Sequence, residues 1–93
     1  MAMQHVEGNT QVKLTLYALS TCPWCGRTKK LLGELGVGYD FVDVDKLKGP
    51  ELSETMKTVE RWNPAGSFPV LVVDDDHCII GFREDEIRAA LVK

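Results

Sequence analysis

Alternating hydrophobic and polar residues predict a β-strand over residues 12–18, and a second strand is predicted over residues 39–44. Between these strands the apolar residues change to helical spacing. The apolar face of this helix is formed by Leu31, Leu32 and Leu35. Ser20 or Thr21 can cap the start of the helix, and Gly36 suits its end. The first half of the chain therefore reads as strand, helix, strand.

The second half of the chain shows a helix, a pair of strands and a final helix. Pro50 suits the first turn of the helix, and the turn-forming segment 63–66 ends it. Residues 69–80 are predicted to form a β-hairpin, because a β-branched run is followed by three aspartates and a further apolar run. The final helix follows Gly81.

This order of elements predicts an α/β fold with a mixed sheet of four strands flanked by helices. A βαβ unit makes its two strands parallel, whereas the hairpin makes the last two strands antiparallel. We expect one domain over residues 11–93 and a flexible leader over residues 1–10, which are polar and show no period. Ligand sites are common at the carboxyl ends of strands in such sheets. The segment directly after Ala18 is therefore a candidate for chemistry.

Composition narrows the class of protein. The 93 residues are 44% hydrophobic and carry a net charge of −3, which suits one small domain and gives no reason to expect a nucleic-acid partner. No apolar run approaches the roughly 20 residues that span a bilayer, and the N-terminal residues lack the features of a secretory signal. Three cysteines are too few for a disulfide scaffold. We expect a cytoplasmic protein without a membrane partner, and a monomer.

Two of the cysteines, Cys22 and Cys25, are three residues apart and lie where the first strand gives way to the helix. Residues i and i+3 share a helix face. One helical turn rises about 5.4 Å, which is within the Cα separation of roughly 4.4–6.8 Å that a disulfide needs. The pair can therefore form and break a disulfide without rebuilding the backbone.

The same placement predicts different roles for the two thiols. A thiolate is the attacking species, and the N-terminus of a helix carries about half a positive charge. Cys22 lies near the N-cap, with Pro23 suited to the first helical position, whereas Cys25 lies deeper. We expect Cys22 to attack a disulfide and Cys25 to resolve the product. Nearby positive charge, which either tunes Cys22 or forms an ordinary solvated helix face, comes from Arg27, Lys29 and Lys30.

These features resemble a glutaredoxin-like protein of the thioredoxin superfamily over roughly residues 12–92. The resemblance rests on Cys22-Pro23-Trp24-Cys25 after the first strand, Arg27 after this motif, Ser67-Phe68-Pro69 before the third strand and Gly81 after the fourth. It implies that the Phe68–Pro69 peptide bond is cis and that the backbone of Phe68 aligns an incoming thiol or peptide. Thr21 and Trp24 would flank the exposed sulfur, and Trp24 would supply apolar area for docking.

The resemblance implies a dithiol–disulfide oxidoreductase without a tightly bound cofactor or a metal ion. Cys22 would attack the disulfide of a target and form a mixed disulfide, and Cys25 would displace the reduced target. The oxidised pair would then be reduced by glutathione, by another small thiol or by a reductase.

Two departures from the family pattern bear on the electron donor. Many glutaredoxins have a Lys or Arg shortly before the first cysteine, where this chain has residues 18–21, and many have acidic residues after the glycine of the last strand. Here that glycine is followed by Phe82 and Arg83, and Gly81-Phe82-Arg83 is similar to NrdH-type redoxins. Such redoxins take electrons from a flavoprotein such as a thioredoxin reductase and pass them to ribonucleotide reductase. Glu84 restores one carboxylate, so glutathione-specific use and a protein-dithiol role both stay open.

An iron–sulfur carrier is the main alternative function. Glutaredoxin-like folds can hold a [2Fe–2S] cluster between Cys22 of two protomers and two external thiols, but Pro23 argues against this because a rigid loop crowds the cluster. A third class is a binding module whose cysteines are vestigial or hold zinc.

The remaining candidate residues have simpler interpretations. Cys78 is expected to pack in the core. A zinc set that joins Cys78 and His77 to the dithiol is disfavoured, because the expected fold places the last hairpin strand to one side. Asp43 and Asp45 follow a strand without metal-ligand spacing and are expected to face solvent.

Overall fold

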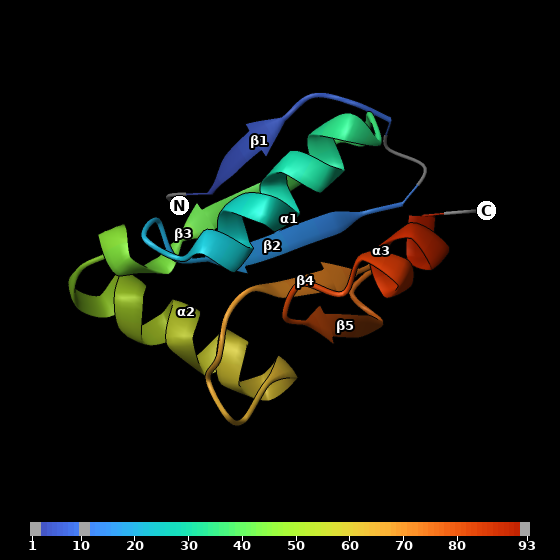
Figure 1. The fold of residues 1–93 in the computed structure, drawn as a ribbon. Helices are drawn as coiled ribbons and strands as arrows, with labels where there is room; N and C mark the ends of the chain where they lie inside the picture. The colour runs from blue at the N-terminus through green and yellow to red at the C-terminus, as the bar shows by residue number, and fades with distance from the viewer. Residues whose placement is uncertain (1–2, 10–11, 92–93) are drawn as a thin grey trace.

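The computed structural model describes residues 3–9 and 12–91, which form a mixed sheet with the strand order β1-β3-β2-β4-β5 (Figure 1). Its strands are β1 (Gln4–Val6), β2 (Leu14–Ala18), β3 (Tyr39–Asp43), β4 (Val70–Val73) and β5 (His77–Ile80). Its helices are α1 (Pro23–Glu34), the short 3₁₀ helix η1 (Val44–Lys46), α2 (Gly49–Trp62) and α3 (Glu84–Leu91). Apart from β1 and η1, the elements follow in the predicted order, and the α/β fold class is confirmed.

The register of the sheet brings the ends of three strands together. β2 and β3 are parallel, with Ala18 opposite Asp43. β4 is antiparallel to β2, with Val70 opposite Tyr17, so the start of β4 lies beside the carboxyl end of β2. β5 pairs antiparallel with β4, which confirms the predicted hairpin. The segment after Ala18 thus meets elements from distant parts of the chain.

The sheet has five strands rather than the predicted four, because β1 pairs antiparallel with the edge of β3. The two backbones approach so closely that a Cβ on Gly8 would lie 2.5 Å from the backbone nitrogen of Gly38. No strand was predicted over residues 4–6, which lie in the segment expected to be a flexible leader. Three residues are too few to show a period, and their regular structure comes from pairing with β3. The predicted domain boundary after residue 10 lies outside the described residues.

Helices cover both faces of the sheet, which gives two hydrophobic clusters. The cluster that α1 and α3 cover includes Leu14, Leu16, Leu32, Leu71 and Ile87. The cluster that α2 covers includes Tyr17, Val42, Val59, Val70 and Val72. β2 contributes to both, and all of its residues are buried, as expected for a central strand with helices on each face. This burial fixes the carboxyl end of β2, from which the dithiol segment continues.

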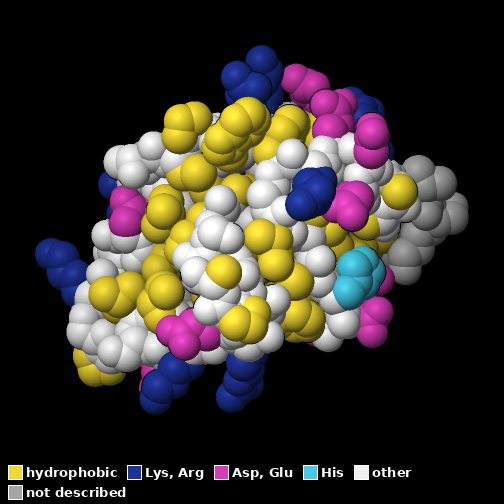
Figure 2. Space-filling view, turned by 60° about the horizontal axis from the view of Figure 1, so that its bottom comes forward, with side chains coloured by type: hydrophobic (Ala, Val, Ile, Leu, Met, Phe, Trp, Pro, Cys, Tyr) yellow, Lys and Arg dark blue, Asp and Glu magenta, His cyan; other side chains and the backbone are white. Residues whose placement is uncertain are grey.

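One face of the molecule shows hydrophobic side chains spread across it, with charged side chains mostly toward the rim (Figure 2). Within the part of the chain that the structure describes, Trp24 is the large hydrophobic residue that stands exposed, with 52% of its surface accessible. None of the helices in the described ranges combines the length and the apolar character that crossing a bilayer requires.

Candidate dithiol site

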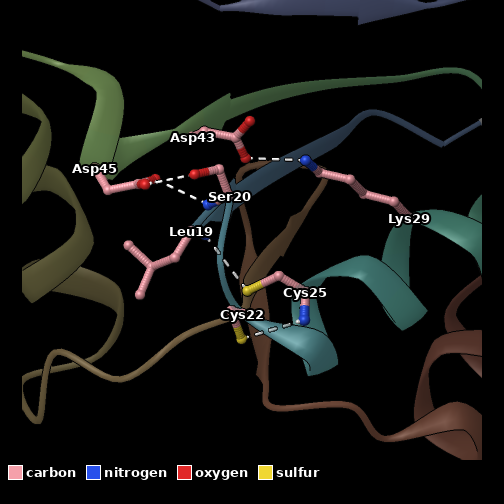
Figure 3. A network of polar contacts seen from close by, with 7 residues as sticks. All are labelled: Leu19, Ser20, Cys22, Cys25, Lys29, Asp43 and Asp45. Carbon is pink, nitrogen blue, oxygen red and sulfur yellow. Dashed lines mark hydrogen bonds and ion pairs between the residues drawn. The ribbon is translucent and has the colours of Figure 1, made fainter.

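The dithiol lies where α1 begins, directly after the carboxyl end of β2 (Figure 3). Cys22 is the N-cap residue of α1, and Pro23 follows in its first turn. The Sγ of Cys22 accepts a hydrogen bond from the backbone N–H of Cys25 at 3.3 Å. The prediction that Ser20 or Thr21 caps this helix is wrong, because the sulfur of Cys22 accepts the N–H bond that a hydroxyl would otherwise accept.

The two sulfurs differ in exposure. Cys22 is half-buried, whereas Cys25 is fully buried, with 0% of its surface accessible. The Sγ of Cys25 accepts a hydrogen bond from the backbone N–H of Leu19 at 3.4 Å. An incoming disulfide can therefore reach Cys22 but not Cys25.

The surroundings shift the pKa values of the two thiols in opposite directions. Partial burial raises the pKa of Cys22, but hydrogen bonds from the Cys25 thiol and from the backbone N–H groups of Cys25 and Trp24 outweigh this effect and leave that pKa below its ordinary value. Burial, together with the hydrogen bond to Cys22, raises the pKa of Cys25 to about 12. The Leu19 N–H and the charge of Lys29 lower this pKa, but their effect is smaller. The more acidic thiol is therefore the accessible one, in the order that the sequence predicts.

An aromatic platform, formed by Trp24 and Phe82, lies beside the start of α1. The two rings are stacked, with centroids 6.1 Å apart and an interplanar angle of 23°. The guanidinium carbon of Arg27 lies 4.8 Å from the centroid of the Trp24 ring, a distance at which a cation and an aromatic face attract. Arg27 therefore supports the platform, while the lowered pKa of Cys22 comes from hydrogen bonds.

The loop before β4 also reaches the site. The Phe68–Pro69 peptide bond is cis, which confirms what the resemblance implies. Pro69 is buried and Phe68 packs against both hydrophobic clusters. The carbonyl of Pro69 accepts a hydrogen bond from the N–H of Gly81 at 2.9 Å. Because β4 pairs with β2, this loop lies at the carboxyl end of β2, where the dithiol segment begins.

Asn63 holds this loop, although the sequence indicates it only as part of a helix-ending segment. Its side chain is buried, and its amide nitrogen donates to the carbonyl and to the hydroxyl of Ser67, each at 2.9 Å. Its side-chain oxygen accepts the N–H of Ala65 at 3.2 Å, the contact of an Asx turn. An asparagine directly after a helix and before a proline is a signal for such a turn, and it could have identified Asn63.

Asp43, the last residue of β3, and Asp45, in η1, make polar contacts beside the dithiol segment (Figure 3). The expectation that both face solvent is wrong for Asp43, which is partly buried. Asp45 is exposed, but it accepts hydrogen bonds from the backbone N–H of Ser20 at 2.8 Å and from the Ser20 hydroxyl at 2.5 Å. Asp43, whose side chain is 14% exposed, forms an ion pair with Lys29 at 2.9 Å. The parallel pairing of β2 with β3 brings these distant residues together.

The charged residues around the platform are engaged with one another. Arg83 forms an ion pair with Glu86 at 3.5 Å. Glu84 accepts a hydrogen bond from the Arg88 side chain at 2.8 Å. Thr21 is exposed in the turn before α1. Of the predicted site residues, Thr21 and Arg83 are thus both exposed.

Cys78 belongs to the opposite face of the sheet. It packs against the cluster that α2 covers, and its thiol donates to the carbonyl of Trp62 at 3.3 Å. Cys22 and Cys25 contact the cluster that α1 and α3 cover. Within residues 3–9 and 12–91, no group of three or more His, Cys, Asp or Glu side chains is arranged to hold a metal ion. The alternative zinc set is therefore not assembled.

Known proteins are similar to this chain in fold and in sequence. A family model described as Glutaredoxin matches residues 14–78. The glutaredoxin from Methanosarcina mazei Go1 is 46% identical in sequence, with a TM-score of 0.90 over 100% of this chain and 90% of that chain. Methanosarcina acetivorans methanoredoxin is 46% identical, with a TM-score of 0.88 over 92% of this chain and 90% of that chain. NrdH-redoxin from Escherichia coli, a glutaredoxin-like protein with a thioredoxin-like activity profile, is 26% identical, with a TM-score of 0.65 over 87% and 96% of the two chains.

The chain therefore belongs to the glutaredoxin family, and its fold is the thioredoxin-like α/β fold. Family membership and the Cys22–Cys25 pair support a thiol redox function. Proteins that carry disulfides are redox partners that fit a member of this family.

Proposed function

We propose that the protein is a dithiol–disulfide oxidoreductase that reduces protein disulfides through Cys22 and Cys25. The contrast between the two sulfurs carries the proposal. Cys22 is partly exposed and has a lowered pKa, whereas Cys25 is buried one helical turn away and has a raised pKa. An attacking thiol must be accessible and ionised, and a resolving thiol must wait within reach of it.

In the proposed reaction, the Cys22 thiolate attacks one sulfur of the target disulfide, and the other target sulfur leaves as a thiolate. Cys25 then attacks the Sγ of Cys22, the bond from Cys22 to the target breaks, and the target leaves fully reduced. Two electrons pass from the dithiol to the target, and the Cys22–Cys25 disulfide remains. An external thiol donor returns this disulfide to the dithiol.

Two surfaces support docking of a protein target beside Cys22. The aromatic platform offers apolar area, since Trp24 is 52% exposed and stacks on Phe82. The Phe68–Pro69 loop lies at the carboxyl end of the central strand. We propose that the target backbone runs along the backbone of Phe68 while its side chains contact Trp24, with Thr21 at the edge.

For the donor, we propose a flavoprotein of the thioredoxin reductase class, or a small thiol that needs no carboxylate to hold an ammonium group. Arg83 stands where many glutaredoxins have an acidic residue, and the carboxylate of Glu84 is paired with Arg88. Glutathione is therefore a weaker candidate. The likeness to NrdH-redoxin supports ribonucleotide reductase as one proposed target.

The test combines three cysteine variants with a protein disulfide as substrate. C25S is expected to trap the target as a stable mixed disulfide on Cys22, whereas C22S traps nothing. C78S, which removes a cysteine on the other face of the sheet, is the matched control and keeps full turnover. Trapping by C22S but not by C25S would reverse the roles, and full turnover by C22S would contradict the proposed function.

Purification without oxygen separates the proposal from the iron–sulfur alternative. Colourless protein with disulfide reductase activity supports the proposal. A brown protein with a bound cluster and no reductase activity would replace it with the carrier function.

A further inference from the structure

The ion pair between Lys29 and Asp43 joins α1, the helix that carries the buried sulfur, to the last residue of β3, and it has no role in the reaction as described so far. Lys29 follows Cys25 by four residues in α1, so their side chains share one face of the helix. Asp43 pairs in register with Ala18, whose neighbour Leu19 donates its N–H to the Sγ of Cys25. In the view of Figure 3, the ion pair lies on the side of Cys25 away from Cys22.

Packing fixes the amine of Lys29. Its Nζ is 2.9 Å from Oδ1 of Asp43 and 4.3 Å from the centroid of the Phe41 ring. Only 27% of the Lys29 side chain and 14% of the Asp43 side chain are exposed. Salt and water screen partly buried charges less than exposed ones. The charge of Lys29 therefore acts more strongly on nearby groups than an exposed charge would.

The resolving step requires charge to develop on a buried sulfur. Cys25 must attack as a thiolate, yet burial holds its proton in place. Charged and titratable groups that act on Cys25 include Cys22 and Lys29, and Asp43 is paired with Lys29. In the mixed disulfide Cys22 has no charge and no proton to donate. Lys29 remains as a cation that favours a thiolate at Cys25.

We propose that Lys29, held in place by Asp43, is a positioning residue for the resolving step and favours the Cys25 thiolate through its charge. The inference rests on the proposed function. In this step Cys25 loses its proton, its sulfur bonds to the Sγ of Cys22, and the bond between Cys22 and the target sulfur breaks. The target sulfur leaves with the electron pair and takes up a proton, while Lys29 stays protonated.

The test separates attack from resolution. Reduced protein is mixed rapidly with a peptide disulfide and quenched with acid, and mass spectrometry follows the mixed disulfide as it forms and decays. In K29M we expect attack at the wild-type rate and resolution about three- to tenfold slower at neutral pH, since one pKa unit is a tenfold change in thiolate. The pH at which resolution reaches half its maximal rate should rise. K29R, which keeps the charge, should restore both quantities.

K30M is the matched control, because Lys30 is the exposed neighbour on the same helix and should leave both rates unchanged. K29Q loses the charge but can still donate a hydrogen bond to Asp43, and it carries the same expectation if K29M does not fold. Resolution at the wild-type rate and pH midpoint in the charge-free variants would overturn the inference, as would equal slowing in K30M. If wild-type protein does not attack the peptide disulfide at all, the proposed function itself fails.

Discussion

The backbone N–H of Cys25 donates a hydrogen bond to the Sγ of Cys22, so the buried cysteine helps to stabilise a thiolate at the exposed one. The geometry is that of a helix N-cap, in which the first turn of α1 points free N–H groups toward the capping side chain. The same turn directs Cys25 into the core. One short stretch of backbone therefore places Cys22 where its pKa is lowered and Cys25 where its pKa is raised.

The aromatic platform leads to a prediction about substrate binding. Replacing Trp24 with Ala removes its exposed ring, and an aromatic contact between this ring and the target would contribute about 0.5–1.5 kcal/mol beyond its buried area. We expect W24A to raise the KM for a protein disulfide about three- to tenfold with little change in kcat. W24F keeps a ring against Phe82 and should recover most of the loss. Equal KM values for wild type and W24A would contradict docking at the platform.

The hydrogen bonds of Asn63 lead to a prediction about stability. N63A removes both donations to Ser67 and the Asx turn, and we expect the free energy of unfolding to fall by about 1–3 kcal/mol. S67A removes only the hydroxyl acceptor and should cost less, because the bond to the Ser67 carbonyl stays. Urea denaturation of the three proteins measures both differences. A loss in N63A no larger than that in S67A would show that Asn63 does not hold the loop.

The contact between Asp45 and Ser20 makes stability depend on pH. Hydrogen bonds from Ser20 hold the pKa of the Asp45 carboxyl below its ordinary value of 3.8. A carboxyl of this kind stabilises the folded protein above its unfolded pKa, and the contribution is lost as the pH falls through the folded pKa. We expect D45A to be less stable than wild type at neutral pH, with the difference shrinking below about pH 4.

Urea denaturation at neutral and acidic pH checks this expectation. E60A, which removes an exposed carboxylate from α2, is the control for a general change in net charge. A difference between D45A and wild type that stays constant across the pH range would mean that the Ser20 contact contributes nothing through ionisation.

The charged residues after Gly81 lead to a prediction about the donor. Glu84 is paired with Arg88, and Arg83, which pairs with Glu86, stands where many glutaredoxins have an acidic residue. We therefore expect the ammonium group of glutathione to be bound weakly. At equal thiolate concentrations, we expect glutathione to reduce the oxidised protein no faster than 2-mercaptoethanol. Rapid-mixing measurements of tryptophan fluorescence can follow both reactions. A saturable, much faster reaction with glutathione would indicate a dedicated glutathione site.

Local patterns explain why much of the fold and the dithiol could be predicted from the sequence. The alternation of hydrophobic and polar residues over residues 12–18 predicts β2, although every residue of β2 is buried between the two hydrophobic clusters. Cys22 and Cys25 are separated by three residues, so a single helical turn decides their relation. The cis bond before Pro69 came from the resemblance, because nothing in the spacing of residues distinguishes it from a trans bond.

Contacts between distant segments explain what the sequence did not reveal. β1 has three residues and owes its structure to an edge of β3. Asp43 was expected to face solvent, and the contacts of Asp43 with Lys29 and of Asp45 with Ser20 were not predicted, because only the parallel pairing of β3 with β2 brings these residues together. The expected tuning of Cys22 by nearby cations also differs from the structure, where hydrogen bonds lower its pKa and Lys29 acts on Cys25.

The account depends most directly on which thiol ionises first. In reduced C78S protein, alkylation by iodoacetamide across a range of pH, read by mass spectrometry, gives the thiolate fraction of each remaining cysteine. We predict that Cys22 reacts with a midpoint below the ordinary thiol value of 9.0, while Cys25 stays protected until the pH approaches about 12. Alkylation of Cys25 before Cys22, or one shared midpoint for both thiols, would contradict the account.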